Sequence, residues 1–330
     1  MARLGVRLEN NPELTPQDYQ DLAVQAEGRG YETVWIPEGG GRDALTQLAS
    51  VAMKTQRVML GTGILAIFSR TPTLTAMSAS GLEAVSQGRF ILGLGVGHQR
   101  SVEGDHGVTF DRPLSRMREM ITIVRRLLSE KSVTHEGRVF QVTDASLGGA
   151  TPETKVPIYI AALGPKMLEL AGEMADGVLL NWTASNHLEQ AIQSVHRGAQ
   201  NVGRDPSEID IAGYVRVAVV DATSEARENL KRQVARYADM RFYRDFFRST
   251  GFAEEMAIAE RAMQQGDMKS AAQAISQDML DQVAIVGTAE ECRTELEKRR
   301  SLGLQLPVVA PFSVGNIKES HRTAIAAFEG

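Results

Sequence analysis

The chain alternates short apolar segments with amphipathic ones, and this alternation repeats about eight times along its 330 residues. Near-continuous apolar runs are typical of parallel strands that are covered on both faces. The predicted strands lie at residues 3–8, 33–37, 57–60, 89–94, 157–162, 177–181, 209–220 and 306–310. Eight strand-then-helix units predict an α/β fold and favour a closed (β/α)8 TIM barrel over an open doubly wound sheet. The dinucleotide-binding pattern Gly-x-Gly-x-x-Gly does not follow the first strand, which agrees with a barrel.

Two segments interrupt the alternation. Residues 131–155, after the fourth strand and its helix, are polar and rich in glycine. Residues 224–281, after the seventh strand, are charged and helical, and they are too long for a single crossover. We therefore expect one barrel domain over residues 1–330, with insertions after strands four and seven.

Composition narrows the class of protein. The net charge of −5 is spread along the chain, which argues against nucleic acid as the main partner. No apolar run approaches the ~20 residues of a membrane span, and the N-terminal segment lacks the apolar core of a signal peptide. The single cysteine, Cys292, excludes an intrachain disulfide and a cysteine-rich metal site. We expect a cytoplasmic protein that acts on a small molecule.

Function in such a barrel sits on the loops that follow the strands. The loop after the third strand, within Gly61–Thr73, contains two glycines that permit close approach of a ligand. Arg70 comes just before the next helix, where exposed amide groups favour an anion. The alternative is a structural bend followed by a capped helix.

The loop after the fifth strand resembles an anion site. It contains Ala162, Leu163, Gly164, Pro165 and Lys166, and it opens a helix. A lysine is electrostatically unfavourable in the first turn of a helix unless an anion is present. This segment therefore predicts a phosphate site, and the alternative is a lysine that points into water.

The titratable candidates are Glu38, His98, Glu103, Asp105 and His106. A histidine can act as an acid or a base near neutral pH. Each could equally be an exposed loop residue, and for Asp105 and His106 that interpretation is favoured. A metal site from His98, His106 and a carboxylate lacks rigid helical spacing, so no metal is expected.

Several motifs, taken together, resemble the luciferase-like family of (β/α)8 oxidoreductases, in particular its coenzyme F420-dependent branch. They are Val34–Gly39, Leu60–Ile64 with Ser69–Pro72, Gly88–Gly95, Gly107–Pro113, Tyr159–Lys166 with Ala171–Gly177, and Val286–Thr288. The matches run along the whole chain, and they are similar to methylenetetrahydromethanopterin reductases over most of it.

The resemblance implies a binding site for a flat three-ring coenzyme. In the family the third strand carries a bulge with a non-prolyl cis peptide against which the ring packs, and the matching bond here is Gly63–Ile64. The phosphate-bearing tail would lie at residues 162–166, which the helix argument also indicates. Gly95 and Gly97 would let the ring approach the fourth strand.

Departures from the family concern the substrate. The glucose-6-phosphate dehydrogenase branch has a histidine and a glutamate where this chain has Gly39 and His98, which argues against that activity. The acidic residue on the first strand of the reductase branch corresponds to Arg7 here. Glu9, two residues on and on the same strand face, could replace it.

The resemblance implies hydride transfer between reduced F420 and an electrophilic carbon or imine of a small substrate, for example of the methylene-tetrahydropterin type. Glu38, His98 or Glu9 would be the acid or base. One alternative is an FMN-dependent luciferase-like monooxygenase, and another is a protein that binds F420 or a flavin without turnover. Because the family often forms dimers, a homodimer is expected.

Overall fold

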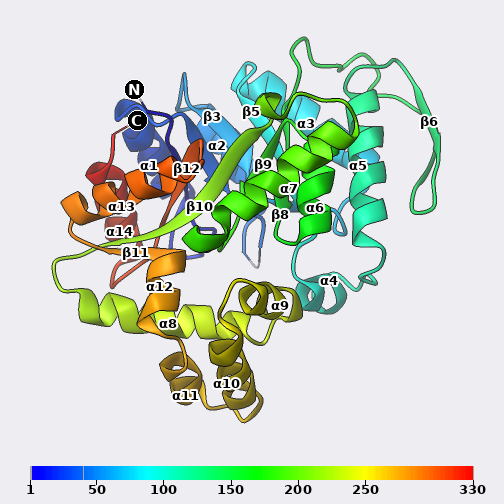
Figure 1. Cartoon of the computed structure of the whole chain (residues 1–330). Coiled ribbons are helices and arrows are strands. Elements are labelled where there is room, and N and C mark those ends of the chain that lie inside the picture. Colours follow the sequence, from blue (N-terminus) through cyan, green and yellow to red (C-terminus); the bar gives the residue numbers. More distant parts are fainter. Residues whose placement is uncertain (1, 40, 330) are drawn as a thin grey trace.

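The computed structural model describes residues 2–39 and 41–329, and its centre is a ring of parallel strands (Figure 1). The ring consists of β1 (Gly5–Arg7), β2 (Thr33–Ile36), β3 (Met59–Thr62), β5 (Phe90–Gly95), β8 (Ile158–Ala162), β9 (Gly177–Leu180), β10 (Asp210–Val219) and β12 (Leu306–Pro311). Each strand pairs with the next, β12 pairs with β1, and β10 pairs with both β9 and β12, so that the ring closes. The predicted (β/α)8 barrel is confirmed.

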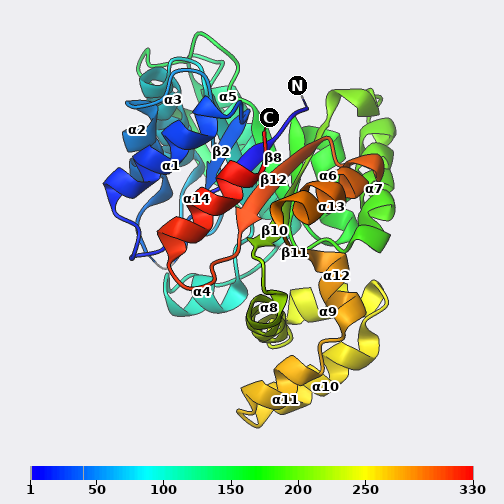
Figure 2. The same cartoon turned by 90° about the vertical axis from the view of Figure 1, so that its left-hand side faces the viewer.

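Helices surround the ring, as Figures 1 and 2 show. They are α1 (Pro16–Gly28), α2 (Ala44–Ala52), α3 (Pro72–Ser86), α5 (Pro113–Leu127), α6 (Pro165–Met174), α7 (Leu188–Asn201), α13 (Ala289–Ser301) and α14 (Ile317–Ala327). The sequence marks several starts: Thr15 and Thr288 form capping boxes with the residues three positions on. Short elements fill the connections: β4 (Leu65–Ala66), α4 (Gln99–Gly104), η1 (Ser185–His187), η2 (Pro206–Glu208) and β11 (Ala284–Gly287).

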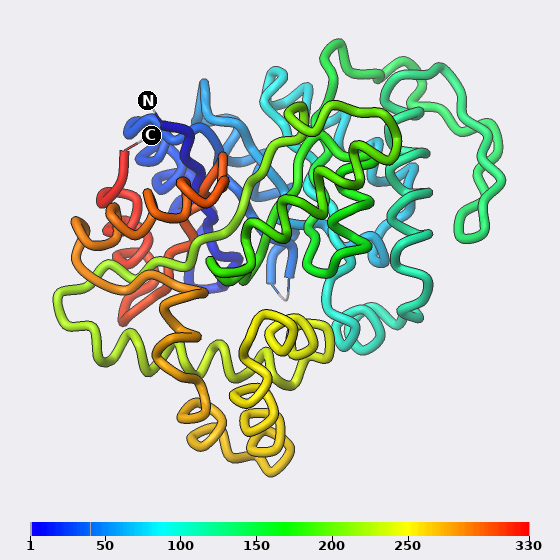
Figure 3. The backbone as a smooth tube through the Cα atoms, in the orientation of Figure 1, coloured from blue at the N-terminus to red at the C-terminus, as the bar shows by residue number. Residues whose placement is uncertain are grey.

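Both predicted insertions are present. The first contains an antiparallel hairpin of β6 (Val133–Glu136) and β7 (Gln141–Ala145), which projects beside α5 at the right of Figure 1. The second, which we call the helical insertion, comprises α8 (Thr223–Tyr237), α9 (Arg241–Ser249), α10 (Ala253–Gln264), α11 (Met268–Gln273) and α12 (Gln277–Val283). The tube in Figure 3 shows it leaving the barrel after β10 and lying across the carboxyl end of the strands. It has its own apolar core, which Trp182 joins from the barrel.

The barrel interior is packed with large side chains. Trp35 and Tyr159 lie at its centre with their ring centroids 5.5 Å apart. Glycines on neighbouring strands make this possible: a Cβ on Gly61 would lie 2.3 Å from the Trp35 ring, and one on Gly177 would lie 2.5 Å from the Tyr159 ring. Because the interior is a packed core rather than a pore, a ligand has to bind at an end of the barrel.

A charge network occupies the amino end. Arg3 bonds Glu32 at 2.7 Å and Asp210 at 2.8 Å, and the Tyr159 hydroxyl donates to Asp210 at 2.5 Å. This network connects the first, second, fifth and seventh strands of the ring. The carboxyl end, under the helical insertion, is therefore where a site is to be sought.

His321 on α14 holds the chain beyond β1. Its Nε2 accepts from the main-chain N–H of Glu9 at 3.2 Å, so the proton must be on Nδ1, which donates to the Ile317 carbonyl at 2.9 Å. The ring is fully buried. Burial lowers the pKa of His321 from 6.5 to about 4, so the neutral form persists in the folded protein.

Among the described residues, no helix combines the length and the apolarity that crossing a bilayer requires.

Replacing Gly93 by alanine should destabilise the fold. A Cβ there would lie 1.9 Å from the buried Thr62 carbonyl oxygen, which is main chain and cannot move aside cheaply. We expect Gly93→Ala to lower the free energy of unfolding by about 3 kcal/mol or more, measured by urea denaturation. Gly28→Ala, at the end of α1 with no atom within 4 Å of the added carbon, should change it by less than about 1 kcal/mol. Equal effects of the two substitutions would contradict this account of the interior.

His321 should make stability depend on pH in acid. Below pH 6.5 the unfolded chain takes up a proton on this ring, whereas the folded chain does so only near pH 4. The free energy of unfolding should therefore fall by on the order of 3 kcal/mol between these values. Urea denaturation of His321→Gln should show a flatter pH dependence, while His106→Gln, on an exposed loop, should follow the wild type. Parallel pH profiles for all three proteins would exclude this role.

Candidate functional site

The loop after β3 is attached to β10 across the mouth of the barrel. The Tyr214 hydroxyl donates to the Gly63 carbonyl at 2.9 Å, and Ile64 packs on the interior core. The Gly63–Ile64 peptide bond is cis, at the position that the family resemblance implied. The neighbouring strands bond this loop on both sides, since Glu38 N–H donates to the Ile64 carbonyl at 3.1 Å and Ile67 N–H donates to the Gly95 carbonyl at 2.9 Å.

The glycines of the rim have different uses. A Cβ on Gly95 would lie 2.6 Å from Ile64 Cγ1, so Gly95 makes room for Ile64 in the folded chain. Gly97 has a φ of 68°, a conformation that favours glycine, and it turns the chain away from β5. Contact of Gly63, Ile64, Gly95 and Gly97 with a coenzyme stays a prediction.

Glu38 and Arg70 form an ion pair at the rim. Arg70 Nη2 lies 2.9 Å from Glu38 and 2.5 Å from Asp43. Burial opposes the charge of Arg70, but its bonds to the two carboxylates outweigh burial and raise its pKa. The Thr71 side chain caps α3 by accepting from Leu74 N–H. Arg70 is therefore paired within the chain and α3 begins with a side-chain cap, which agrees with the alternative of a structural bend, and binding of an external anion here stays a prediction.

His98 faces the helical insertion. It precedes α4, and its ring centroid lies 5.8 Å from that of Tyr243 and 6.3 Å from that of Tyr237. The side chain reaches solvent, yet the protein around the ring removes enough water to lower its pKa. This shift favours the neutral form of the imidazole, which is the form that can accept a proton. Glu9 lies at the same end of the barrel, where its described contacts are those of its main chain with His321 and Tyr19.

The start of α6 is open, as the phosphate hypothesis requires. Gly164 is the N-cap and makes no side-chain hydrogen bond, and a Cβ on it would meet no atom of the described residues within 4 Å. Ala162 is buried and Leu163 is partly buried, while Pro165 and Lys166 are exposed. Lys166 also borders a groove of about 800 Å³ between α5, the β6–β7 hairpin and α6. Binding of a phosphate here stays a prediction.

Sequence reasoning missed a polar group on β10 and its neighbours. Arg216 Nη2 donates to Asn181 Oδ1 at 2.8 Å, and Asn181 Nδ2 donates to the Tyr243 hydroxyl at 2.8 Å. The Arg216 guanidinium also lies 4.3 Å from the centre of the Trp182 ring. The available signal was the spacing of Tyr214 and Arg216, two polar side chains on one face of a strand whose other residues after Asp210 are apolar.

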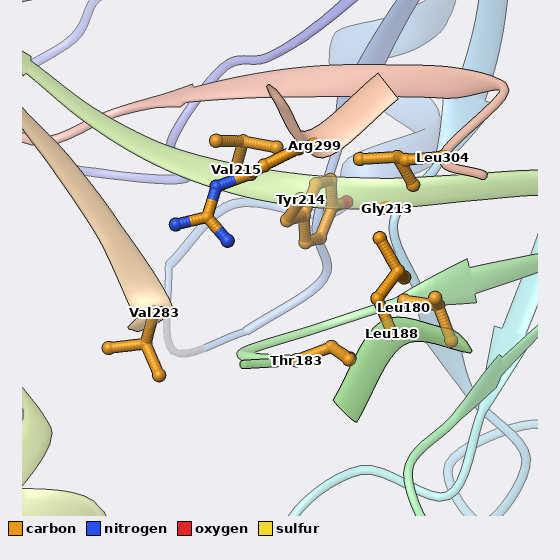
Figure 4. A pocket seen from close by; sticks show the side chains of 9 residues that line it. All are labelled: Leu180, Thr183, Leu188, Gly213, Tyr214, Val215, Val283, Arg299 and Leu304. Carbon is orange, nitrogen blue, oxygen red and sulfur yellow. The ribbon is translucent and has the colours of Figure 1, made fainter. Parts of the chain in front are cut away.

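A small cavity lies outside the ring, between β9 and β10 and the helices that cover them (Figure 4). It measures about 20 Å³, which is room for about one water molecule. Arg299 lines it and donates to the Gln282 carbonyl at the end of α12 at 2.9 Å. The cavity belongs mainly to the packing of the surrounding helices on the barrel, and Val283 at the end of α12 also lines it. Within residues 2–39 and 41–329, no cluster of three or more His, Cys, Asp or Glu side chains could hold a metal ion.

Comparison with known proteins agrees with this architecture. The family model described as luciferase-like monooxygenase matches residues 2–306. The chain is 33% identical to the 5,10-methylenetetrahydromethanopterin reductase of Methanolobus tindarius, over 94% of each chain. It is 30% identical to a putative coenzyme F420-dependent oxidoreductase of Mycobacterium tuberculosis, over 96% of this chain and 97% of that protein.

A solved structure gives the same result. The coenzyme F420-dependent tetrahydromethanopterin reductase of Methanopyrus kandleri superposes with a TM-score of 0.82 and 26% identity. The match covers 99% of this chain and 98% of that one. The fold, the rim and the matched family model lead to one conclusion: the chain belongs to the luciferase-like family of barrel proteins.

Proposed function

We propose that the chain is an F420-dependent oxidoreductase that transfers a hydride between the deazaflavin and a small organic substrate. The observation that carries the proposal is that one rim contains both the Gly63–Ile64 loop, which the Tyr214 hydroxyl holds, and the open start of α6. Two relatives named as F420-dependent support it, because they match nearly the whole chain. Fold alone would not, since one barrel serves many chemistries.

The residues of the rim fit such a coenzyme. Ile64 and Gly97 would border its ring, and residues 162–166 would hold its phosphate-bearing tail at the start of α6. The open space at Gly164 and the missing side-chain cap leave main-chain N–H groups available there. When bound, the deazaflavin supplies the hydride chemistry, and the protein supplies position and electrostatics.

We favour His98 over Glu38 and Glu9 as the proton acceptor. Both Glu38 oxygens face Arg70, at 2.9 Å and 3.5 Å, which restricts that carboxylate. Desolvation lowers the pKa of His98, which favours the neutral form, and the ring lies beside the tyrosines of the helical insertion, where a substrate would be enclosed. The finer substrate hypothesis, a methylene-tetrahydropterin-type imine, depends on the reductases among the relatives.

Fluorescence titration with F420 and with its deazaflavin lacking the tail tests the proposal. Wild type should bind both compounds and bind FMN more weakly. Lys166→Glu should weaken F420 binding about tenfold, because it reverses a charge at the phosphate site, and should leave binding of the tail-less compound unchanged.

Lys269→Glu, with the same change in charge on the exposed side of α11, is the control and should bind F420 as wild type does. Binding of FMN without binding of F420 would favour the monooxygenase alternative. Binding of F420 without hydride transfer to any tested imine or carbonyl compound would favour the non-catalytic alternative.

We also propose a homodimer formed through the outer face of α3. Leu74, Met77 and Val85 lie on one side of that helix and are 44%, 56% and 44% exposed, and Met53 at the end of α2 is 70% exposed. Sedimentation should give twice the chain mass of 36.0 kDa for wild type and a monomer for Met77→Glu. Val202→Glu, which adds the same charge at an exposed apolar residue after α7, should remain dimeric. A monomeric wild type would refute the proposal.

A further inference from the structure

Two arginines converge on one tyrosine at the carboxyl end of the barrel. The Arg7 guanidinium carbon lies 5.7 Å from the centre of the Tyr214 ring, and that of Arg216 lies 5.5 Å from it. Arg7 is on β1 and Arg216 is on β10, with β12 between them in the ring. Tyr214 is the residue whose hydroxyl bonds the Gly63 carbonyl, so the two guanidinium groups lie beside the proposed coenzyme site.

The charge of Arg216 is not compensated within the described residues. Arg216 is 7% exposed, and its buried Nη1 has no hydrogen-bond partner there. Its Nη2 donates a hydrogen bond to Oδ1 of Asn181, which carries no charge. The charged or titratable groups that act on Arg216 are Arg7 and the hydroxyls of Tyr214, Tyr237 and Tyr243, and none is a carboxylate. Burial and the charge of Arg7 lower the pKa of Arg216 to about 10, so it remains a cation at neutral pH.

Other arginines at this end of the barrel and in the helical insertion are paired with carboxylates. Arg70 binds two carboxylates, and Arg244 and Arg248 of the helical insertion both bind Glu260. A buried guanidinium without such a partner is costly, because its desolvation is not offset by an opposite charge. An uncompensated buried cation with a free N–H group, located at a ligand-binding rim, indicates that the ligand provides the anion.

The surroundings of Arg216 are aromatic. Its guanidinium stacks 4.3 Å from the Trp182 ring, whose buried Nε1 also has no partner among the described residues. The Tyr237 ring lies 5.1 Å from Trp182 and 4.6 Å from Tyr243. Aromatic walls with few polar atoms suit a flat organic group.

We propose that Arg216, assisted by Arg7, binds an anionic group of the substrate, a carboxylate or a phosphate, and places its flat remainder against the aromatic side chains of the helical insertion. Arg216 would thereby determine specificity for anionic substrates. The placement beside a hydride donor rests on the proposed function, whereas the anion site itself does not. The same anion could instead come from the coenzyme, and the experiment distinguishes the two sources.

Calorimetric titration of the full chain with benzoate and with benzamide, its neutral analogue, tests the site. Wild type should bind benzoate at least about tenfold more tightly than benzamide, because an ion pair with the guanidinium replaces an unpaired charge. Arg216→Gln should lose this preference. Arg57→Gln, an exposed arginine just before β3 at the opposite end of the barrel, removes the same charge and should keep the preference.

The melting temperature of each variant without ligand shows whether it folds. Arg216→Gln should melt at or above the wild-type temperature, because it removes a buried unpaired charge. If Arg216→Gln melts below the wild-type temperature, Arg7→Gln serves as the second variant. Arg7→Gln should reduce the preference for benzoate over benzamide at least about threefold. Equal binding of benzoate and benzamide by wild type, or an unchanged preference in both variants, would overturn the proposal.

F420 titrations of the same proteins separate the two sources of the anion. F420 binding should be unchanged in Arg216→Gln. Loss of F420 binding in this variant would assign the arginine to the coenzyme and overturn the substrate site. If wild type binds benzoate with the expected preference but does not bind F420, the proposed function fails while the anion site stands.

Discussion

The structure depends on how the barrel interior is filled. Trp35 and Tyr159 occupy the centre, and they fit because Gly61 and Gly177 on neighbouring strands have no side chain. Close packing of this kind makes the interior of the ring a solid core rather than a pore. Ile64 and Tyr214 pack on this interior core at the carboxyl end of the barrel. The functional groups above are therefore held by strands rather than by loops alone.

Charge compensation separates the residues of the rim into two groups. Glu38 and Arg70 satisfy one another, and this pair holds the loops after β2 and β3 together. Arg216 is buried, and within the described part of the chain its Nη1 has no hydrogen-bond partner, which is the observation behind the proposed anion site. Stability by itself does not favour such an arrangement. The contrast between a satisfied pair and an unsatisfied cation is the main argument for a ligand at this place.

Family membership accounts for the barrel, but it does not determine the substrate. The residues expected to matter lie on the rim, where Arg7 is on β1 and His98 follows the glycines of β5. The aromatic residues of α9 add a wall whose partners are Asn181 and His98 on the barrel. Relatives with the same coenzyme can thus act on chemically different compounds.

The sequence by itself determined the elements and their order. Apolar runs predict the buried strands, residues such as Thr15 and Thr288 predict helix starts, and both insertions stand out as breaks in the alternation, because these signals depend on neighbours within a few positions. Only the tertiary structure decided which charges are paired. Arg70 could not be matched to Glu38, nor Arg7 placed beside Arg216, until ring closure brought distant strand ends together. Compensation of charge is a property of spatial neighbours, which local sequence patterns do not specify.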